Sequence, residues 1–242
     1  MTPDTAEGGG TLEPAEGGGT PEPAKGGGTL DGGQAQDLDE AWQEIQPDAA
    51  RRLLIAAVDA FAARGFHATT TRDIAGGAGM SPAGLYVHYR SKEELLHRIT
   101  LIGHQQTRGL MRAAVSRAAD PAGQLRELIR DLTTWQARFH TTARVVEYEL
   151  HFLSGEHHAE ITLLRREMDG LVRQILEDGA AQGVFDVPDV PTTALALLSL
   201  SVDVARWYHV SARLPPEQLG LLYADLALRM VGAGGTAVGA GR

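Results

Sequence analysis

The segment from Thr69 to Leu96 constrains the fold of this chain more than any other part of the sequence. It contains two short stretches that begin with capping residues and are joined by Gly79, followed by the start of a further helix at Ser91 and Lys92. Small polar residues cap the first amides of a helix, and glycine permits the tight turn between two helices. This order predicts a helix-turn-helix, whose second helix enters the major groove of DNA.

Local signals set the expected bounds of these helices. An apolar stripe predicts a helix over residues 48–64 that stops at Gly65. Thr70, with Asp73 three residues later, forms a short-armed capping box for a second helix that ends near residue 78. Ser81 caps a third helix and Pro82 occupies its first turn. Gly76 and Gly77 inside the second helix weaken it by about 1 kcal/mol each relative to alanine.

The N-terminal segment resembles the DNA-binding domain of TetR-family transcriptional regulators. The resemblance rests on Gly65-Phe66, Thr69-Thr70, Arg72-Asp73-Ile74-Ala75, Gly79, Ser81, Leu85-Tyr86, His88-Tyr89 and Ser91-Lys92-Glu93-Glu94-Leu95. Tyr89 departs from the phenylalanine usual in the family. The resemblance implies an all-α homodimer with a three-helix DNA-binding head and a six-helix ligand-binding body. It also implies repression that a small molecule relieves.

The candidate DNA contacts follow from helix geometry and from that resemblance. They are Thr70, Thr71, Arg72, Ser81, Ala83, Gly84, Tyr86, His88 and Lys92. A hydroxyl at a helix N-terminus suits a phosphate oxygen, and a small apolar side chain suits a thymine methyl group. The resemblance assigns Tyr86 and His88 to phosphate and base edges, and Lys92 to a phosphate. Because the start of the third helix carries few hydrogen-bonding groups, we expect DNA shape to contribute to specificity.

The charge distribution is compatible with DNA binding despite the net charge of −9. Residues 1–46 carry ten acids and one base, which accounts for the whole net charge. Residues 50–100 carry seven bases and four acids. The acidic character therefore lies outside the predicted head.

The N-terminal tail is repetitive. Three nine-residue repeats occupy Ala6–Pro14, Ala15–Pro23 and Ala24–Gly32. Glycine triplets with few large apolar groups cannot offset the entropy lost on folding, so residues 1–46 are expected to be disordered. This tail has two interpretations. It is either an inert linker or an acidic segment that competes with DNA phosphates for the basic face of the head. Residues 234–242 are expected to form a flexible C-terminal tail.

The sequence predicts three units, namely this tail, a DNA-binding domain over 47–99 and a ligand-binding and dimerisation domain over 100–233. Periodicity and punctuation predict body helices over 92–118, 121–139, 142–153, 156–182, 191–211 and 215–232. Gly183 followed by Val184 marks the end of one of them. The prolines at 188 and 191 predict an extended segment over 185–191.

The helix over 191–211 is apolar almost all round, so it must be covered on several sides. Pairing with the helix over 215–232 and with a second copy of both would form a four-helix bundle. A central core helix within one subunit is the alternative. The candidate interface residues are Leu195, Leu198, Val202, Leu222 and Leu226.

A ligand cavity in the body is expected from the resemblance. Its candidate lining residues are Trp135, Phe139, Arg144, Tyr148, Phe152, Leu164, Met168 and Trp207, which could equally form a plain core. Arginines lie nearby at positions 130, 138, 144, 165, 166 and 206. An apolar tunnel with arginines at its mouth suits a lipid-like acid or an acyl-CoA. The stretch Ala143–Leu150 and the segment around 191–211 resemble TetR-family members that sense acyl-CoA or steroid-derived thioesters.

Other function classes have little support in the sequence. It has no cysteine, no phosphate-binding glycine loop with lysine, and no nucleophile-elbow or His-Glu-x-x-His motif. Adjacent His157 and His158 point about 100° apart on a helix, so a solvated helix start is expected there, not a metal site. We expect a cytoplasmic, non-enzymatic protein without cofactor. A ligand-independent helix-turn-helix activator or architectural protein is one alternative, and a helical small-molecule-binding protein with a vestigial head is another.

Overall fold

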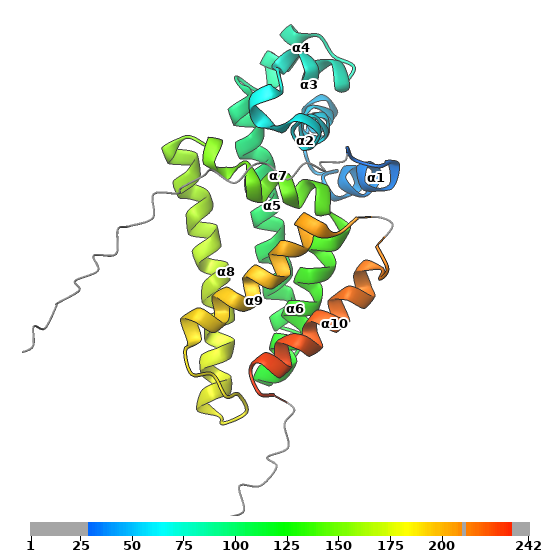
Figure 1. Ribbon diagram of the computed structural model, residues 1–242. Helices are drawn as coiled ribbons and strands as arrows, with labels where there is room; N and C mark the ends of the chain where they lie inside the picture. The colour runs from blue at the N-terminus through cyan, green and yellow to red at the C-terminus, as the bar shows by residue number, and fades with distance from the viewer. Residues whose placement is uncertain (1–28, 210–211, 234–242) are drawn as a thin grey trace, which may run out of the picture.

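The computed structural model describes residues 29–209 and 212–233, and within these ranges the chain is built from helices (Figure 1). The α-helices are α1 (Gly32–Ala41), α2 (Asp48–Ala68), α3 (Thr71–Gly77), α4 (Pro82–His88), α5 (Lys92–Val115), α6 (Pro121–Arg138), α7 (His140–Tyr148), α8 (Gly155–Ala181), α9 (Val190–Trp207) and α10 (Pro216–Met230). A 3-10 turn, Leu150–Phe152, lies between α7 and α8. The predicted all-α fold is confirmed.

The head and the body are joined by one long helix. Figure 1 shows α2, α3 and α4 at one end of the molecule, with α5 running from them into the body of α6 to α10. The boundary predicted at residue 99 therefore falls inside α5. One apolar core also crosses this boundary, since Leu54 and Leu85 of the head belong to the same buried cluster as Phe139 and Leu164 of the body.

The expectation of disorder over residues 1–46 is wrong for its last part, where α1 forms. Asp31 caps α1 by accepting a hydrogen bond from the amide of Gln34 at 2.7 Å. Leu38 and Trp42 are 2% and 1% exposed, so this short segment buries enough apolar surface to offset its ordering. Residues 1–28, which include the first two repeats, lie outside the described residues, as do residues 234–242.

The predicted caps of the head are present. The Thr70 side chain accepts a hydrogen bond from the amide of Asp73, and the Asp73 carboxylate accepts one from the amide of Thr70. Ser81 and Ser91 accept hydrogen bonds from the amides of the third residues of α4 and α5. Gly65 has φ +76° within α2, the left-handed conformation expected at the predicted stop.

Two helix ends in the body differ from expectation. The helix that starts at residue 190 ends at Trp207, not at 211, because Tyr208 turns to an extended conformation and its hydroxyl donates to the carbonyl of Leu214 at 3.1 Å. The helix expected over 142–153 spans His140–Tyr148 and gives way to the 3-10 turn. After Gly183, Phe185 packs back onto α8 at Gly179 and is 6% exposed, whereas Val184 is 45% exposed.

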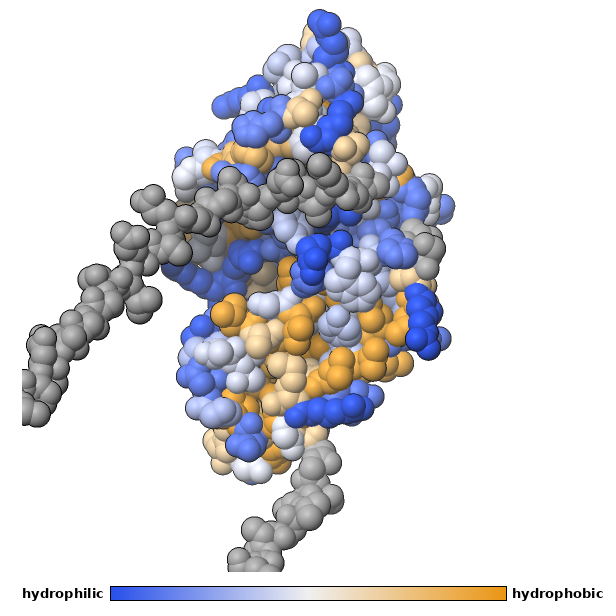
Figure 2. All heavy atoms as spheres, in the orientation of Figure 1, coloured by the Kyte–Doolittle hydropathy of each residue, from blue (hydrophilic) through white to orange (hydrophobic). Residues whose placement is uncertain are grey.

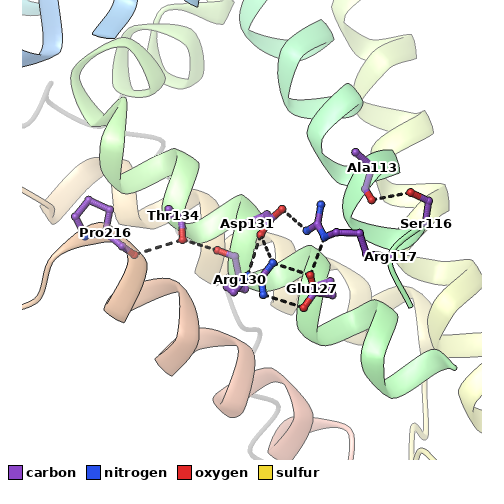
Figure 3. Close-up of polar contacts among 8 residues, drawn as sticks. All are labelled: Ala113, Ser116, Arg117, Glu127, Arg130, Asp131, Thr134 and Pro216. Carbon is purple, nitrogen blue, oxygen red and sulfur yellow. Dashed lines mark hydrogen bonds and ion pairs between the residues drawn. The ribbon is translucent and has the colours of Figure 1, made fainter. Parts of the chain in front are cut away.

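Polar and steric contacts fix α6 against its neighbours (Figure 3). Arg117, beyond the end of α5, forms ion pairs with Glu127 and Asp131 of α6, and Arg130 joins the same network. On the opposite side, α10 approaches so closely that a β-carbon on Gly220 would lie 2.6 Å from the carbonyl oxygen of Arg130. The close approach requires glycine at this position.

Candidate DNA-binding surface and effector cavity

The helix-turn-helix is held rigidly by the helix behind it. Arg52 of α2 donates to the carbonyl of Ala78 at the turn at 3.2 Å, and the hydroxyl of Tyr89 donates to the carbonyl of Ala50 at 3.3 Å. The Tyr89 ring is buried, and burial raises the pKa of its hydroxyl to about 12. Tyr89 thus takes the place of the phenylalanine usual in the family, and its hydroxyl group has a hydrogen-bond partner.

The exposed face of α4 carries two large side chains. Tyr86 is 54% exposed and Val87 is 79% exposed, whereas the neighbouring Leu85 is fully buried. The hydroxyl of Tyr86 lies 3.2 Å from that of Thr71 at the start of α3, so a hydrogen bond orients the tyrosine. Val87 was missed in the sequence, where an apolar residue in a short helix suggests only core packing. Its exposure on α4 makes it a further candidate for a contact with DNA.

The other predicted contacts on α3, on α4 and at their caps are at least partly exposed. Thr70, Arg72, Ser81 and Ala83 are exposed, and Thr71, Gly84 and His88 are partly buried. The oxygens of Thr70 and Ser81 already serve as caps. Both hydroxyls point along helix N-termini, where the helix dipole favours a phosphate oxygen.

Lys92 begins α5 as predicted, and its side chain points to the C-terminal end of α2. Its ammonium donates to the carbonyls of Phe66, His67 and Thr69 at 2.7, 3.3 and 3.0 Å, and lies 4.3 Å from the centroid of the Phe66 ring. An ammonium has three N–H donors, so all of them are used at the C-terminal end of α2. This geometry does not support the expected phosphate contact and makes Lys92 a C-terminal cap of α2.

A small apolar cavity of about 110 Å³ lies between α1 and helices α5 to α9. Its apolar lining comes from Leu38, Trp42, Met111, Leu132, Trp135, Phe139, Val146, Met168, Leu198 and Val202. Gly103 of α5 also lines it, and a β-carbon there would lie 3.2 Å from Val146. The missing side chain at Gly103 thus allows Val146 to pack closely against α5 beside the cavity.

Two buried polar atoms accompany this apolar lining. His104 is 3% exposed, and its Nδ1 lies 2.9 Å from the carbonyl oxygen of Thr100, so Nδ1 carries the proton and donates. Its Nε2 is then an acceptor, and it has no hydrogen-bond partner among the described residues. Burial lowers the pKa of His104, which keeps the ring neutral. The Oε1 of Gln136 is likewise buried and unpartnered.

A second hollow, a groove of about 740 Å³, lies between α8 and α9. Arg165, Arg166 and Arg173 of α8 line it together with apolar residues of α9. Arg165, Leu198 and Val202 line both the groove and the cavity, so these side chains form the partition between the two. The groove therefore places three guanidinium groups next to an apolar space, and two of them form ion pairs with Glu147 and Asp169.

The predicted cavity residues divide into two groups. Trp135, Phe139 and Met168 line the cavity. Arg144, Tyr148, Phe152, Leu164 and Trp207 do not. Phe152 instead stacks on Phe66 of the head at 4.9 Å between ring centroids, and Tyr148 and Trp207 are 47% and 41% exposed. Leu164 is buried in the apolar core that joins head and body. An apolar helix face therefore does not by itself show which cavity or core its residues enter.

The start of α8 is more structured than expected. His157 stacks on His97 of α5 with 3.6 Å between ring centroids, and Glu93 lies 2.8 Å from His157. Glu160 lies 2.8 Å from His97. His157 is therefore part of the α5–α8 contact, while His158 is exposed.

An apolar surface covers α9 and α10. Leu195, Leu200, Leu221, Leu222, Leu226 and Met230 are between 41% and 63% exposed. Figure 2 shows apolar residues gathered on this side of the body. Of the predicted interface residues, Leu195, Leu222 and Leu226 belong to this surface, whereas Leu198 and Val202 are half-buried and face the cavity and groove.

The head and the body each match a family of known proteins. Residues 48–99 match the family described as bacterial regulatory proteins, tetR family, and residues 118–231 match a tetracyclin repressor-like C-terminal domain. The HTH-type transcriptional repressor KstR2 of Mycolicibacterium smegmatis is 31% identical over 188 residues, which cover 76% of this chain and 91% of that protein. The chain belongs to the TetR family.

Solved structures agree with this assignment. A tetR-family regulatory protein from Rhodococcus RHA1 is 39% identical with a TM-score of 0.75, and the match covers 78% of this chain and 100% of that one. AibR in complex with isovaleryl coenzyme A and operator DNA is 25% identical with a TM-score of 0.68, and the match covers 76% and 98% of the two chains. TetR-family members are DNA-binding transcriptional regulators, and the family is not an enzyme family. Over the described residues, no helix is both long and apolar enough to cross a bilayer.

Proposed function

We propose that this TetR-family protein is a homodimeric cytoplasmic repressor that leaves a palindromic operator when a small molecule enters the body. The observation that carries the proposal is the small apolar cavity, whose acceptor atoms on His104 and Gln136 have no hydrogen-bond partner among the described residues. It lies in the body, and α5 connects this body to the helix-turn-helix. Relatives named as repressors, with similar length, support the same role.

The proposed reading of DNA rests on α4. Tyr86 contacts the backbone or a base edge, held by Thr71, and Val87 or Ala83 contacts a thymine methyl group. Thr70, Ser81 and the two helix N-termini bind phosphates, and Arg72 adds a charge-assisted contact. Gly84 permits close approach of the backbone, and His88 supplies a further polar contact.

The cavity limits both the hydrogen-bonding groups and the size of the effector. The neutral His104 offers only an acceptor, so it favours a ligand group with an O–H or N–H donor and disfavours a carboxylate. A volume of about 110 Å³ is smaller than the 150 Å³ of an engineered cavity that binds benzene. This size supports a short acyl group and argues against a fused-ring steroid in this conformation.

The neighbouring groove suits the remainder of an acyl-CoA. Arg165, Arg166 and Arg173 would bind its phosphates while the acyl end passes the partition formed by Leu198 and Val202. AibR, a structural relative, was solved with isovaleryl coenzyme A. We therefore propose a short-chain acyl-CoA as the effector class. Arg165 and Arg173 form ion pairs with Glu147 and Asp169, whereas Arg166 takes part in neither pair. Replacement of Arg166 should therefore weaken the binding of the acyl-CoA.

A mobility-shift titration tests this function. Full-length protein is bound to an operator selected from genomic fragments, and short-chain acyl-CoA thioesters, free coenzyme A and free acids are added separately. Release by a thioester, and not by coenzyme A or the acid alone, is the expected result. DNA binding that no thioester alters would favour the ligand-independent regulator. Absence of any selected DNA would favour the binding protein with a vestigial head.

A further inference from the structure

Helix α1 lies outside both matched family segments, yet it forms part of the wall of the cavity. We propose that α1 closes the effector cavity, sets the length of the acyl group that triggers release of DNA, and transmits the occupancy of the cavity to the DNA-binding head. This inference rests on the proposed function, because it assumes that the effector enters this cavity. No tail residue before 29 is needed for it.

Leu38 of α1 and Trp42, the residue that follows its last turn, face the cavity. Both are almost fully buried and both line the cavity. The indole N–H of Trp42 lies 3.4 Å from Oε1 of Gln106, and Nε2 of Gln106 donates to the carbonyl of Ala41 at 3.0 Å. Gln106 itself lines the cavity, so a cavity residue of α5 holds the C-terminal end of α1. The indole therefore stands as a wall at one end of the space.

A second set of contacts ties α1 to the body. The carboxylate of Asp37 accepts two hydrogen bonds from Arg138 at 2.9 Å each. Gln34 accepts a hydrogen bond from the hydroxyl of Thr141 at 2.9 Å. His140 Nδ1 donates to the carbonyl of Ala137, so its Nε2, 3.2 Å from Nε2 of Gln34, is the atom that can accept from the Gln34 amide. These contacts hold α1 on α6 and α7.

A third set of contacts ties α1 to the head. Asp39 forms an ion pair of 2.7 Å with Arg51 of α2, whose side chain is only 15% exposed. The amide of Leu30 donates to Asp59 of α2 at 2.9 Å. Asp39 follows Leu38 directly on the same helix, so a displacement of the cavity wall moves the partner of Arg51 as well. Helix α2 supports the helix-turn-helix through Arg52, which binds the carbonyl at its turn.

These three sets of contacts give α1 a defined action. An acyl group longer than the closed cavity allows presses on Trp42 and moves α1 outward. That movement draws Asp39 from Arg51 and shifts α2 relative to the body, which changes the placement of the recognition helix. Acyl groups that fit without touching Trp42 bind without this effect. Trp42 is thus a specificity-determining residue, and Asp39 is a coupling residue that does not touch the ligand.

Replacement of Trp42 tests the wall. Full-length Trp42→Ala is titrated with linear acyl-CoA thioesters of increasing chain length, with operator release as the readout. We expect the chain length of greatest effect to increase relative to the native protein. Free indole should refill the space, raise the melting temperature of Trp42→Ala but not of the native protein, and restore the native preference.

Replacement of Asp39 tests the coupling. Full-length Asp39→Asn should bind the thioester in the absence of DNA within about twofold of the native affinity. Its operator affinity should fall only about twofold when the thioester is added, compared with tenfold or more for the native protein, in the usual range of allosteric coupling. Gln36→Ala, on the exposed face of α1, is the matched control and should behave as the native protein.

The outcomes separate this inference from the proposed function. If the native protein responds to a thioester but Trp42→Ala keeps its chain-length preference, or Asp39→Asn keeps full release, the role of α1 is refuted. If the native protein responds to no thioester, the proposed effector class is wrong. The indole experiment then decides whether Trp42 forms a wall of the cavity. Stabilisation of Trp42→Ala by indole then supports the wall, and no stabilisation overturns it.

Discussion

At the scale of single residues, Lys92 shows how the structure changes an assignment made by resemblance. The sequence places it at the start of α5, where a phosphate contact is expected. In the structure its three N–H donors face the carbonyls that end α2, and its charge lies over Phe66. A cation at this position stabilises the C-terminal end of a helix through the helix dipole. The position of an atom relative to a helix end cannot be read from spacing alone.

This role predicts how Lys92→Met behaves. The substitution keeps the aliphatic stem and removes three charge-assisted hydrogen bonds, so we expect a loss of about 1–3 kcal/mol in the free energy of unfolding. Thermal or urea unfolding measures it. Operator affinity measured against salt concentration should keep its slope, because no phosphate contact is lost. A slope smaller by about one would show that Lys92 does bind a phosphate.

His104 makes stability depend on pH. Burial lowers its pKa, so the folded ring stays neutral while the unfolded ring takes a proton below about pH 6.5. Between these two pKa values the unfolded state binds more protons, and stability falls as pH decreases. We expect His104→Asn to reduce the loss of unfolding free energy between about pH 7 and pH 5.5, measured by urea titration. His140, whose pKa burial also lowers, contributes in the same direction.

A matched replacement provides the control for this pH effect. His158 is exposed at the start of α8, so His158→Asn should leave the pH dependence of stability unchanged. An equal change in both variants, or none in His104→Asn, would contradict the buried neutral histidine.

At the scale of helices, the packing of α10 on α6 depends on the absence of a side chain. A β-carbon on Gly220 would lie 2.2 Å from the hydroxyl of Thr134 and 2.6 Å from a backbone oxygen of α6. Gly170, on α8, is also helical, but a β-carbon there would meet nothing within 4 Å. The two glycines therefore serve as a natural pair for separating helix propensity from packing.

Alanine substitutions at these glycines should have opposite effects. Gly220→Ala forces α10 from α6 and is expected to lower the free energy of unfolding by about 1–3 kcal/mol. Gly170→Ala gains helix propensity and should raise it by about 0.5–1 kcal/mol. Chemical denaturation of both proteins measures the difference. An unchanged stability of Gly220→Ala would mean that the close approach of α10 is not needed.

Most helices could be predicted because their ends carry local signals. The capping box at Thr70 and the stop at Gly65 depend on neighbours in the sequence, and the structure contains both. The end of α9 depends on a contact of Tyr208 with Leu214 across a loop, which periodicity does not encode. Helix α1 was missed because a composition averaged over 46 residues hid a short segment with a capping Asp31 and apolar Leu38 and Trp42.

The cavity was predicted less well than the head for a similar reason. Trp135, Phe139 and Met168 line it as expected, but the residues that give it polarity and closure come from elsewhere. His104 lies on α5, whose sequence shows only a long amphipathic helix, and Trp42 lies in the tail. A cavity is formed where several helices meet, so its lining depends on how helices cross and not on the pattern of any one of them.

At the scale of the whole molecule, the exposed leucines of α9 and α10 indicate association. Several large apolar side chains lie together on this side of the body, which is costly in a monomer and typical of an interface. The same face was expected from the all-round apolarity of the 191–211 segment. Two copies paired here would form a four-helix bundle and carry two recognition helices.

A charge placed on this surface should separate the copies. Leu226→Glu is expected to shift the protein from dimer to monomer in light scattering after size exclusion, because the carboxylate would be buried without a partner. Operator affinity should fall at least tenfold with it, since one half-site contact is lost. Leu163→Glu is the control, because Leu163 is also exposed but lies on α8. Dimers that persist in Leu226→Glu would place the interface elsewhere.

The central claim, that the surface around α4 reads a two-fold symmetric DNA site, is tested most directly by selection from a random duplex library. Full-length protein should enrich a palindrome with half-sites in successive major grooves, and Tyr86→Ala should bind the enriched site at least tenfold more weakly while its melting temperature is unchanged. Enrichment of no sequence, or equal binding by Tyr86→Ala, would contradict the account.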